Sequence, residues 1–260
     1  MLRWSHLAVA FPATVFAGLL ALPMLALALG MNPAAVAAGM RNPSFVDALL
    51  LSLRTSLCST ACVLLLGTPL ALAIAQLSGR WGRVAEALVA LPVALPPTVM
   101  GVALLLAFGR NGLIGQTFPS VRLAFSELAV VLAQITVSAP FFVASGVVAI
   151  RRVEAEQLWV ARSLGASWLK AQVWVALPEA FPGLVAGALL AWSRAVGELG
   201  ATLIFAGNLP GETQTMPLAI LTAFESDVRL AVALALVLSA LCGLALVAVA
   251  LVEPAGRRSR

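Results

Sequence analysis

Long apolar runs constrain this chain more than any other feature. A membrane-crossing helix needs about 20 apolar residues, and runs of that order recur six times, at 7–29, 48–76, 84–109, 125–149, 179–206 and 229–252. Backbone groups in lipid must pair internally, so only helices or closed barrels span a membrane, and no run alternates with the period of two typical of a barrel strand. We predict an all-α, polytopic membrane protein with six transmembrane helices, in which residues 1–260 form a single domain.

Composition supports a lipid environment. The chain is 62% hydrophobic and only 10% charged, whereas soluble domains carry about 25% charged residues. The net charge of +5 lies in short clusters between the apolar runs and forms no basic patch for nucleic acid. Cys58, Cys62 and Cys242 lie within apolar runs and lack metal-ligand spacing, so we interpret them as small buried hydrophobic residues and expect neither metal nor cofactor.

The loops between the runs differ in basic charge. One side would hold ten basic residues, namely Arg3, Arg80, Arg83, Arg151, Arg152, Arg162, Lys170, Arg257, Arg258 and Arg260. The other side holds four, namely Arg41, Arg110, Arg122 and Arg229. Loops rich in Lys and Arg stay in the cytoplasm, so both termini and residues 151–178 are predicted to be cytoplasmic. The first run exceeds the about 7–15 residues of a signal peptide core, and we interpret it as a retained helix.

Residues 151–178 interrupt the apolar pattern with a charged segment. It reads as a helix, a turn at Gly165 and a second helix, with Pro178 in the first turn of the helix that follows. On a helical wheel of 153–164, an apolar stripe would pack on the membrane domain, and an opposite stripe of Leu158, Trp159 and Arg162 would face the cytoplasm. Exposed apolar residues of that kind need a partner to cover them. The alternative is an amphipathic loop on the membrane surface.

This segment resembles the Glu-Ala-Ala coupling loop of bacterial ABC importer permeases. Residues that match the loop pattern, or stand at its positions, are Ala161, Gly165, Val175, Leu177 and Pro178. Trp159 and Val160 replace the usual Glu and Ala, while Glu154 and Glu156 lie just upstream. The resemblance implies that Leu158, Trp159, Arg162, Gly165 and Pro178 belong to a coupling segment that docks on a separate ATP-binding subunit. The chain itself has no GKS or GKT phosphate loop.

Two further stretches resemble permeases of molybdate importers, with sulfate and tungstate permeases as close relatives. They are LPVALPPTVMGVALLLAFGRNGLIGQ (91–116) and RAVGELGATLIFAGNLPGETQTMPLAI (194–220), and the likeness extends over most of 45–240. The resemblance implies a homodimer in a bacterial inner membrane, with the path at its two-fold axis. It also implies two ATP-binding cassette subunits and an extracytoplasmic oxyanion-binding protein as partners.

Several residues of these stretches suit a path or gate. Pro96 and Pro97, with Pro92, should bend or break the third span, and broken helices often line a path; a simple kink is the alternative. Gly197 and Gly200 allow helices to approach closely, which also suits plain packing.

Arg194 and Glu198 lie one helical turn apart in the fifth run. They form either a mutually neutralised lock, which we favour, or a cationic waypoint for an anion. Arg54, in the second run, would face the path or extend to the membrane surface.

Residues 207–217 fall outside the cytoplasm in this topology. Asn208, Thr213 and Thr215, with Gln214, offer hydrogen-bonding groups that would meet a binding protein, unless this is simply a solvated loop. We predict the transmembrane subunit of an ATP-driven molybdate importer without catalytic activity of its own. The alternatives are a sulfate or tungstate permease, an ATP-independent channel or carrier and, least favoured, an intramembrane enzyme.

Overall fold

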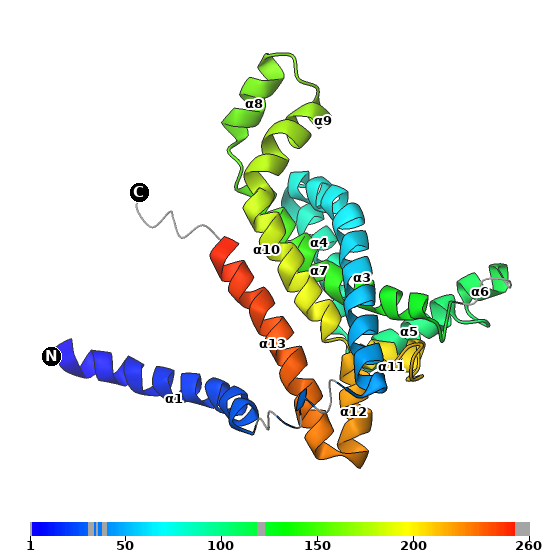
Figure 1. Ribbon diagram of the computed structural model, residues 1–260. Helices are drawn as coiled ribbons and strands as arrows, with labels where there is room; N and C mark the ends of the chain where they lie inside the picture. Colours follow the sequence, from blue (N-terminus) through cyan, green and yellow to red (C-terminus); the bar gives the residue numbers. More distant parts are fainter. Residues whose placement is uncertain (1, 31–33, 35, 38–40, 119–122, 253–260) are drawn as a thin grey trace.

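The computed structural model describes residues 2–30, 34, 36–37, 41–118 and 123–252, and the regular elements of these residues are all helical (Figure 1). Within these described ranges, six segments are long and apolar enough to cross a membrane, which confirms the predicted number. They contain α1 (Leu2–Leu29), α3 (Pro43–Gln76), α5 (Pro97–Phe108) with α6 (Leu113–Thr117), α7 (Glu127–Arg151), α10 (Leu177–Val196) and α13 (Val228–Val252). Arg122, Arg257, Arg258 and Arg260, which entered the charge count, lie outside the described residues.

The proline-rich stretch divides the predicted third span. α4 (Gly79–Ala94) ends before Leu95, and α5 begins at Pro97. Leu95 and Pro96 are extended because a proline disfavours helical geometry in the residue before it and supplies no N–H. The predicted break is therefore confirmed, but the predicted bounds of 84–109 are wrong. The membrane-crossing segment begins at Pro97, because α4 is short and carries three charged residues.

The centre of the molecule is a bundle of α3, α7 and α10. Its core joins these helices through residues such as Val63, Phe142, Val147 and Ala180. Close approach depends on glycine, since a Cβ on Gly67 of α3 would lie 2.8 Å from the Phe142 ring of α7. Small residues that face one another let helices pack tightly in lipid, where the hydrophobic effect does not drive helix association.

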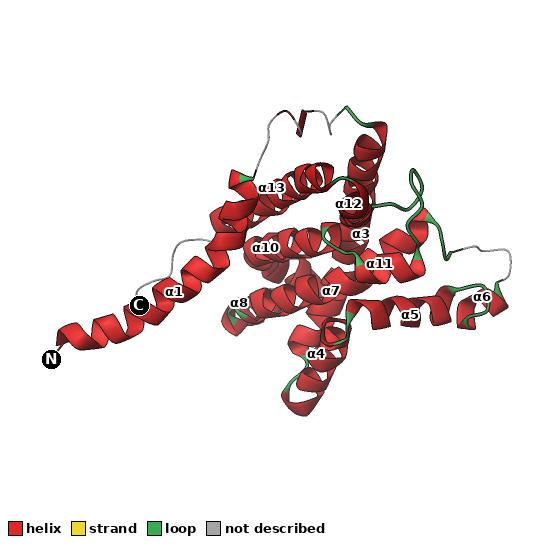
Figure 2. Ribbon diagram, turned by 90° about the horizontal axis from the view of Figure 1, so that it is seen from below, coloured by secondary structure: helices red, strands yellow, loops and turns green. Residues whose placement is uncertain are grey.

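Two smaller clusters complete the core. One joins α5 and α7 to α11 (Gly200–Phe205), and the other joins α3 and α13 to α12 (Met216–Ser226). α12 was not predicted as a helix. α1 and the α5–α6 segment extend to opposite sides of the central bundle (Figure 2). The most apolar part of α1 is 0% buried, so its surroundings must come from lipid or another chain.

α3 and α7 run parallel and are joined at both ends by arginines. At one end Arg54 pairs with Glu127. At the other end the Arg151 guanidinium donates to the Ile74 carbonyl at 3.3 Å and pairs with Glu86 at 2.6 Å. The segment with Arg80 and Arg83, which follows α3, and residues 151–178, which follow α7, both begin at this second end. The two basic segments assigned to the same side of the membrane therefore lie at the same end of the bundle.

Candidate functional site

The predicted gate residues gather where the fifth span is broken. α10 ends at Val196 and α11 begins at Gly200, so the continuous helix predicted for 179–206 is wrong. Glu198 lies in the break and is 1% exposed. Its Oε1 accepts the Ala201 N–H at 2.7 Å, which satisfies one of the otherwise unpaired N–H groups at the start of α11.

Arg194 neutralises the same carboxylate. Its Nη2 lies 2.7 Å from Oε2 of Glu198, and the two side chains are 31% and 1% exposed. Each carboxylate oxygen therefore has its own charged or polar partner, as a buried charge requires. The geometry is the one that a structural lock needs. Both the lock and the anion waypoint remain predictions about function.

The start of α5 packs against the start of α11. A Cβ on Gly200 would lie 2.7 Å from Cβ of Pro97, and a Cβ on Gly101 would lie 2.8 Å from Ile204. The structure thus brings Pro97 and Gly200 together, with Pro96 just before the contact and Glu198 just before α11. Gly197 is exposed, and a Cβ there would meet only its own helix among the described residues. The close helix approach predicted at Gly197 is therefore not found in the described part of this chain.

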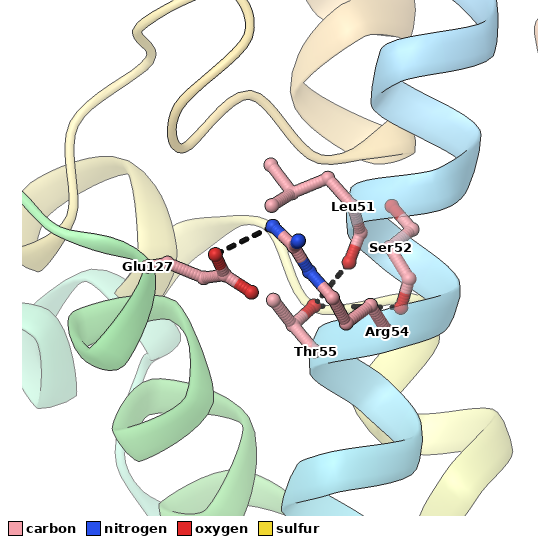
Figure 3. Close-up of polar contacts among 5 residues, drawn as sticks. All are labelled: Leu51, Ser52, Arg54, Thr55 and Glu127. Atoms are coloured by element: carbon pink, nitrogen blue, oxygen red, sulfur yellow. Dashed lines mark hydrogen bonds and ion pairs between the residues drawn. The ribbon is translucent and has the colours of Figure 1, made fainter.

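A second ion pair joins α3 to the first turn of α7 (Figure 3). Nη2 of Arg54 lies 2.5 Å from Oε2 of Glu127, and the side chains are 67% and 38% exposed. Arg54 was predicted to face the path or to extend to the membrane surface, and no partner for it was foreseen. The partner is 73 positions away in the chain, which is why sequence spacing gave no signal.

Sequence reasoning also missed a line of buried hydroxyl groups on α3. Ser52 accepts the Met216 N–H at 2.7 Å, and Ser56 accepts the Trp192 Nε1–H at 3.1 Å. These bonds attach α3 to α12 and α10, and the helical spacing of Ser and Thr in LSLRTSLCST was the available signal. Buried side-chain atoms without a hydrogen-bond partner among the described residues occur in Gln134, Ser138, Thr202 and Thr215.

The coupling segment folds as α8 (Ala155–Ser163), a turn and α9 (Trp168–Ala171). Gly165 has φ +91°, and the Ala166 N–H donates to the Ala161 carbonyl in the Schellman arrangement that ends many helices. The predicted glycine turn is confirmed. Trp159 is 71% exposed and Arg162 is exposed, as the predicted cytoplasmic stripe requires.

Leu158 does not belong to that stripe. It is partly buried and packs against the core of α3, α7 and α10, whereas Leu164 is 84% exposed. The helical wheel began at Val153, but α8 begins only at Ala155, and the intervening residues form a bend. Within α8, Leu158 and Ala161 form the inward face. Trp159 and Arg162 form an outward face, which we call the docking face.

Pro178 lies in the first turn of α10, as predicted, but α10 continues the helical segment before it without a break. The helical segment runs from Trp168 to Val196 and contains a π-helical turn, η1, at Gln172–Ala176. The Leu177 N–H donates to the Gln172 carbonyl five residues earlier. Such a widened turn accommodates a proline inside a helix, where it removes an N–H and crowds the preceding turn.

The loop at residues 207–217 is more buried than predicted. Thr213 and Thr215 are 0% exposed. Contrary to our prediction, their side chains are therefore not available to a binding protein. The carbonyl of Leu209 accepts three N–H groups within the turn, and the Thr213 hydroxyl accepts the Leu209 N–H at 3.1 Å. Asn208 is partly exposed but donates to Thr222. The exposed tip of the loop is instead residues 209–212.

Comparison with known proteins identifies the class. Residues 67–258 match the family model described as "Binding-protein-dependent transport system inner membrane component". The chain belongs to this family, and it is a multi-pass inner membrane protein that serves as the transmembrane subunit of an ABC importer.

Individual relatives agree with the family. The chain is 42% identical to the molybdenum transport system permease protein ModB of Mycobacterium tuberculosis, over 99% of this chain and 97% of the relative. It is 34% identical to the ModB protein of Escherichia coli K12, over 69% and 80%. A solved chain of a bacterial alginate ABC transporter, in complex with an alginate pentasaccharide-bound periplasmic protein, has a TM-score of 0.68 at 17% identity over 98% and 94%. A chain of the MetNI methionine ABC transporter has 0.62 at 18% identity over 82% and 96%.

Proposed function

We propose that this importer subunit carries molybdate. The observation that carries the proposal is the 42% identity to the mycobacterial molybdenum permeases over nearly the whole of both chains. Relatives named for molybdenum transport also occur in Bacillus subtilis and Haloferax volcanii. Tungstate and sulfate have the same charge and a similar tetrahedral shape, and they are the alternative cargoes.

We further propose that the subunit works as a homodimer with two separate ATP-binding cassette subunits. The exposed docking face, with Trp159 at 71% exposure, supports a helix-in-groove contact with such a subunit. α1 projects from its own bundle with its apolar surface uncovered, which supports contact with a second copy. ATP binding and hydrolysis would rock the two copies between inward-open and outward-open states. The chain needs no cofactor for this task.

An extracytoplasmic binding protein would deliver the anion to the loop at residues 207–217. The exposed residues 209–212 support this position for the contact. Both termini would lie in the cytoplasm, because α8 and the loops with most basic charge lie at the end of the bundle opposite this loop (Figure 1).

The test is reconstitution of the permease with its ATPase and binding protein in liposomes. ATP-dependent uptake of radiolabelled molybdate is expected, and unlabelled tungstate and sulfate are then added as competitors. A sulfate permease would show uptake blocked by sulfate at concentrations that leave a molybdate system unaffected. Uptake without ATP would instead support a channel or carrier.

A further inference from the structure

The Arg54–Glu127 pair lies at the outer boundary of the membrane. Residues 55–75 of α3 and 128–150 of α7 carry no charged side chain. At about 1.5 Å per residue, each stretch matches a hydrocarbon core of roughly 30 Å. The inner ends of both stretches meet at Arg151, which donates to the Ile74 carbonyl. Because α3 and α7 run parallel, Arg54 and Glu127 mark the opposite boundary.

This pair connects α3 to the block that holds the candidate gate. Two residues before Glu127, the Phe125 N–H donates to the Phe205 carbonyl of α11 at 3.1 Å. The first turns of α7 also pack with α5 and α11 in one apolar cluster. The same α5–α11 block contains the Pro97–Gly200 contact and the buried Glu198. Arg54 therefore lies close to the candidate gate rather than on a remote surface.

The Arg54 guanidinium has unused binding capacity. Its side chain is 67% exposed, and among the described residues Glu127 is its one hydrogen-bond partner. A guanidinium offers five N–H donors in a planar fork, which suits two adjacent oxygens of an oxyanion. Glu127 is itself 38% exposed, so the carboxylate remains solvated when the guanidinium changes partner.

We propose that Arg54 receives the tetrahedral oxyanion at the outer mouth of the path and that Glu127 is its resting counter-ion. The inference rests on the proposed function and adds a named residue to it. An arriving dianion competes with a single carboxylate for the guanidinium, and the return of Glu127 releases the anion inward. Exchange of this kind keeps anion binding weak, as conduction requires, since a site that binds too tightly traps its ion.

A native thiol allows the site to be probed directly. Cys58 is exposed rather than buried as we predicted, and it lies one helical turn beyond Arg54. In a Cys62→Ala, Cys242→Ala background it is the sole cysteine. We expect membrane-impermeant methanethiosulfonates to modify Cys58 from outside in the assembled transporter. The rate ratio of anionic to cationic reagent should rise in Glu127→Gln and fall in Arg54→Gln, each by about tenfold for one charge at this spacing in water.

The decisive measurement is the protection that bound molybdate gives Cys58 against modification. At constant ionic strength, molybdate should slow the anionic reagent, more strongly in Glu127→Gln and not at all in Arg54→Gln. Chloride at the same ionic strength is the control for electrostatic screening by salt. No modification of Cys58 from outside, or equal protection in all variants, overturns the proposal. Tungstate and sulfate are tested alongside, so that protection by either one without molybdate uptake would refute the proposed cargo while supporting Arg54.

Measurements of uptake distinguish an anion-binding role of Arg54 from a purely structural role of its pair with Glu127. Arg54→Gln should reduce initial uptake about tenfold or more, the value of a charge-assisted contact, while Arg54→Lys should retain part of it. Under our proposal, Arg54→Gln combined with Glu127→Gln stays impaired, because the cation is still missing. Recovery in the double variant would show a purely structural pair and overturn the proposal. Arg41→Gln removes an exposed arginine outside α3 and should leave uptake unchanged.

Discussion

Arg194 and Arg54 both pair with a glutamate, but the two pairs lie in opposite settings. Arg194 and Glu198 lie four residues apart beside a helix break, and the glutamate is 1% exposed. Arg54 and Glu127 come from different helices, and both remain exposed to 38% or more. Glu198 also accepts a backbone N–H, whereas the described structure gives no such bond to the Glu127 carboxylate.

This difference in burial favours different roles for the two ion pairs, although both consist of an arginine and a glutamate. A buried carboxylate with a partner for each oxygen gains nothing by changing its partner, which favours the predicted lock over the anion waypoint. An exposed pair is worth little as a link, so its charges are free to exchange with a passing ion. Burial, rather than residue type, therefore separates the lock from the proposed anion site.

The largest expected effect comes from breaking the buried pair. Arg194→Gln leaves the Glu198 carboxylate unpaired at 1% exposure, and breaking such pairs costs about 3–5 kcal/mol. Glu198→Gln should cost less, because the remaining arginine is 31% exposed and glutamine still accepts the Ala201 N–H. The measurement is thermal unfolding of the purified permease in detergent, followed by tryptophan fluorescence.

The double variant Arg194→Gln, Glu198→Gln serves as the control. It should recover most of the lost stability, since no charge is then left unpaired. A double variant no more stable than Glu198→Gln alone contradicts the lock. If the double variant is folded and transports molybdate at the parental rate, Arg194 is not a waypoint for the anion.

The docking face is exposed like the Arg54–Glu127 pair, but its tryptophan is apolar and needs a partner to cover it. Trp159→Ala should weaken ATPase binding by about 2 kcal/mol, roughly 30-fold, as truncation of a central interface aromatic does. The unfolding midpoint of the isolated permease should stay unchanged, because Trp159 is 71% exposed. Co-purification and titration of the ATPase measure this. Phe224→Ala is a matched control, because Phe224 is 65% exposed and belongs to α12, which lies at the opposite end of the bundle from α8 (Figure 1). Equal ATPase affinity in both variants would contradict the assigned face.

The exposed ion pair should contribute little to stability. Glu127→Gln is expected to change the free energy of unfolding by less than about 1 kcal/mol, in line with exposed salt bridges. A double-mutant cycle with Arg54→Gln measures the coupling directly. A coupling as large as that of Arg194 with Glu198 would remove the distinction between the two pairs.

The smallest expected effect comes from two cysteine substitutions that test which side of the membrane each loop occupies. Cysteines at Ser167 and Glu212 replace exposed residues. Ser167 lies between α8 and α9, and Glu212 lies in the loop between α11 and α12, at the opposite end of the bundle (Figure 1). Neither change should affect stability or uptake. In intact cells of a strain whose permease has its native cysteines replaced, an impermeant maleimide should label only Glu212→Cys. Labelling of Ser167→Cys from outside would invert the proposed topology and place Arg54 at the cytoplasmic boundary.

Local chemistry determined several features from the sequence by itself. The six membrane segments follow from apolar runs, because each residue contributes its own transfer free energy. The break at Pro96 follows from the missing N–H and the steric demand of proline. Gly165 lies where the chain takes a positive φ, a geometry that glycine adopts at little cost. These properties depend on a residue and its immediate neighbours, so they can be predicted without a fold.

Tertiary structure decided which side chains are buried and which meet. The inward direction of Leu158, the burial of Thr213 and the pairing of Arg54 with Glu127 all depend on neighbours far away in the sequence. The break between α10 and α11 contains no proline and is held by Glu198 and by the contact of Gly200 with Pro97. Helical periodicity gives the relative direction of side chains along one helix, but only packing against other helices determines which direction faces the core and which remains free to bind.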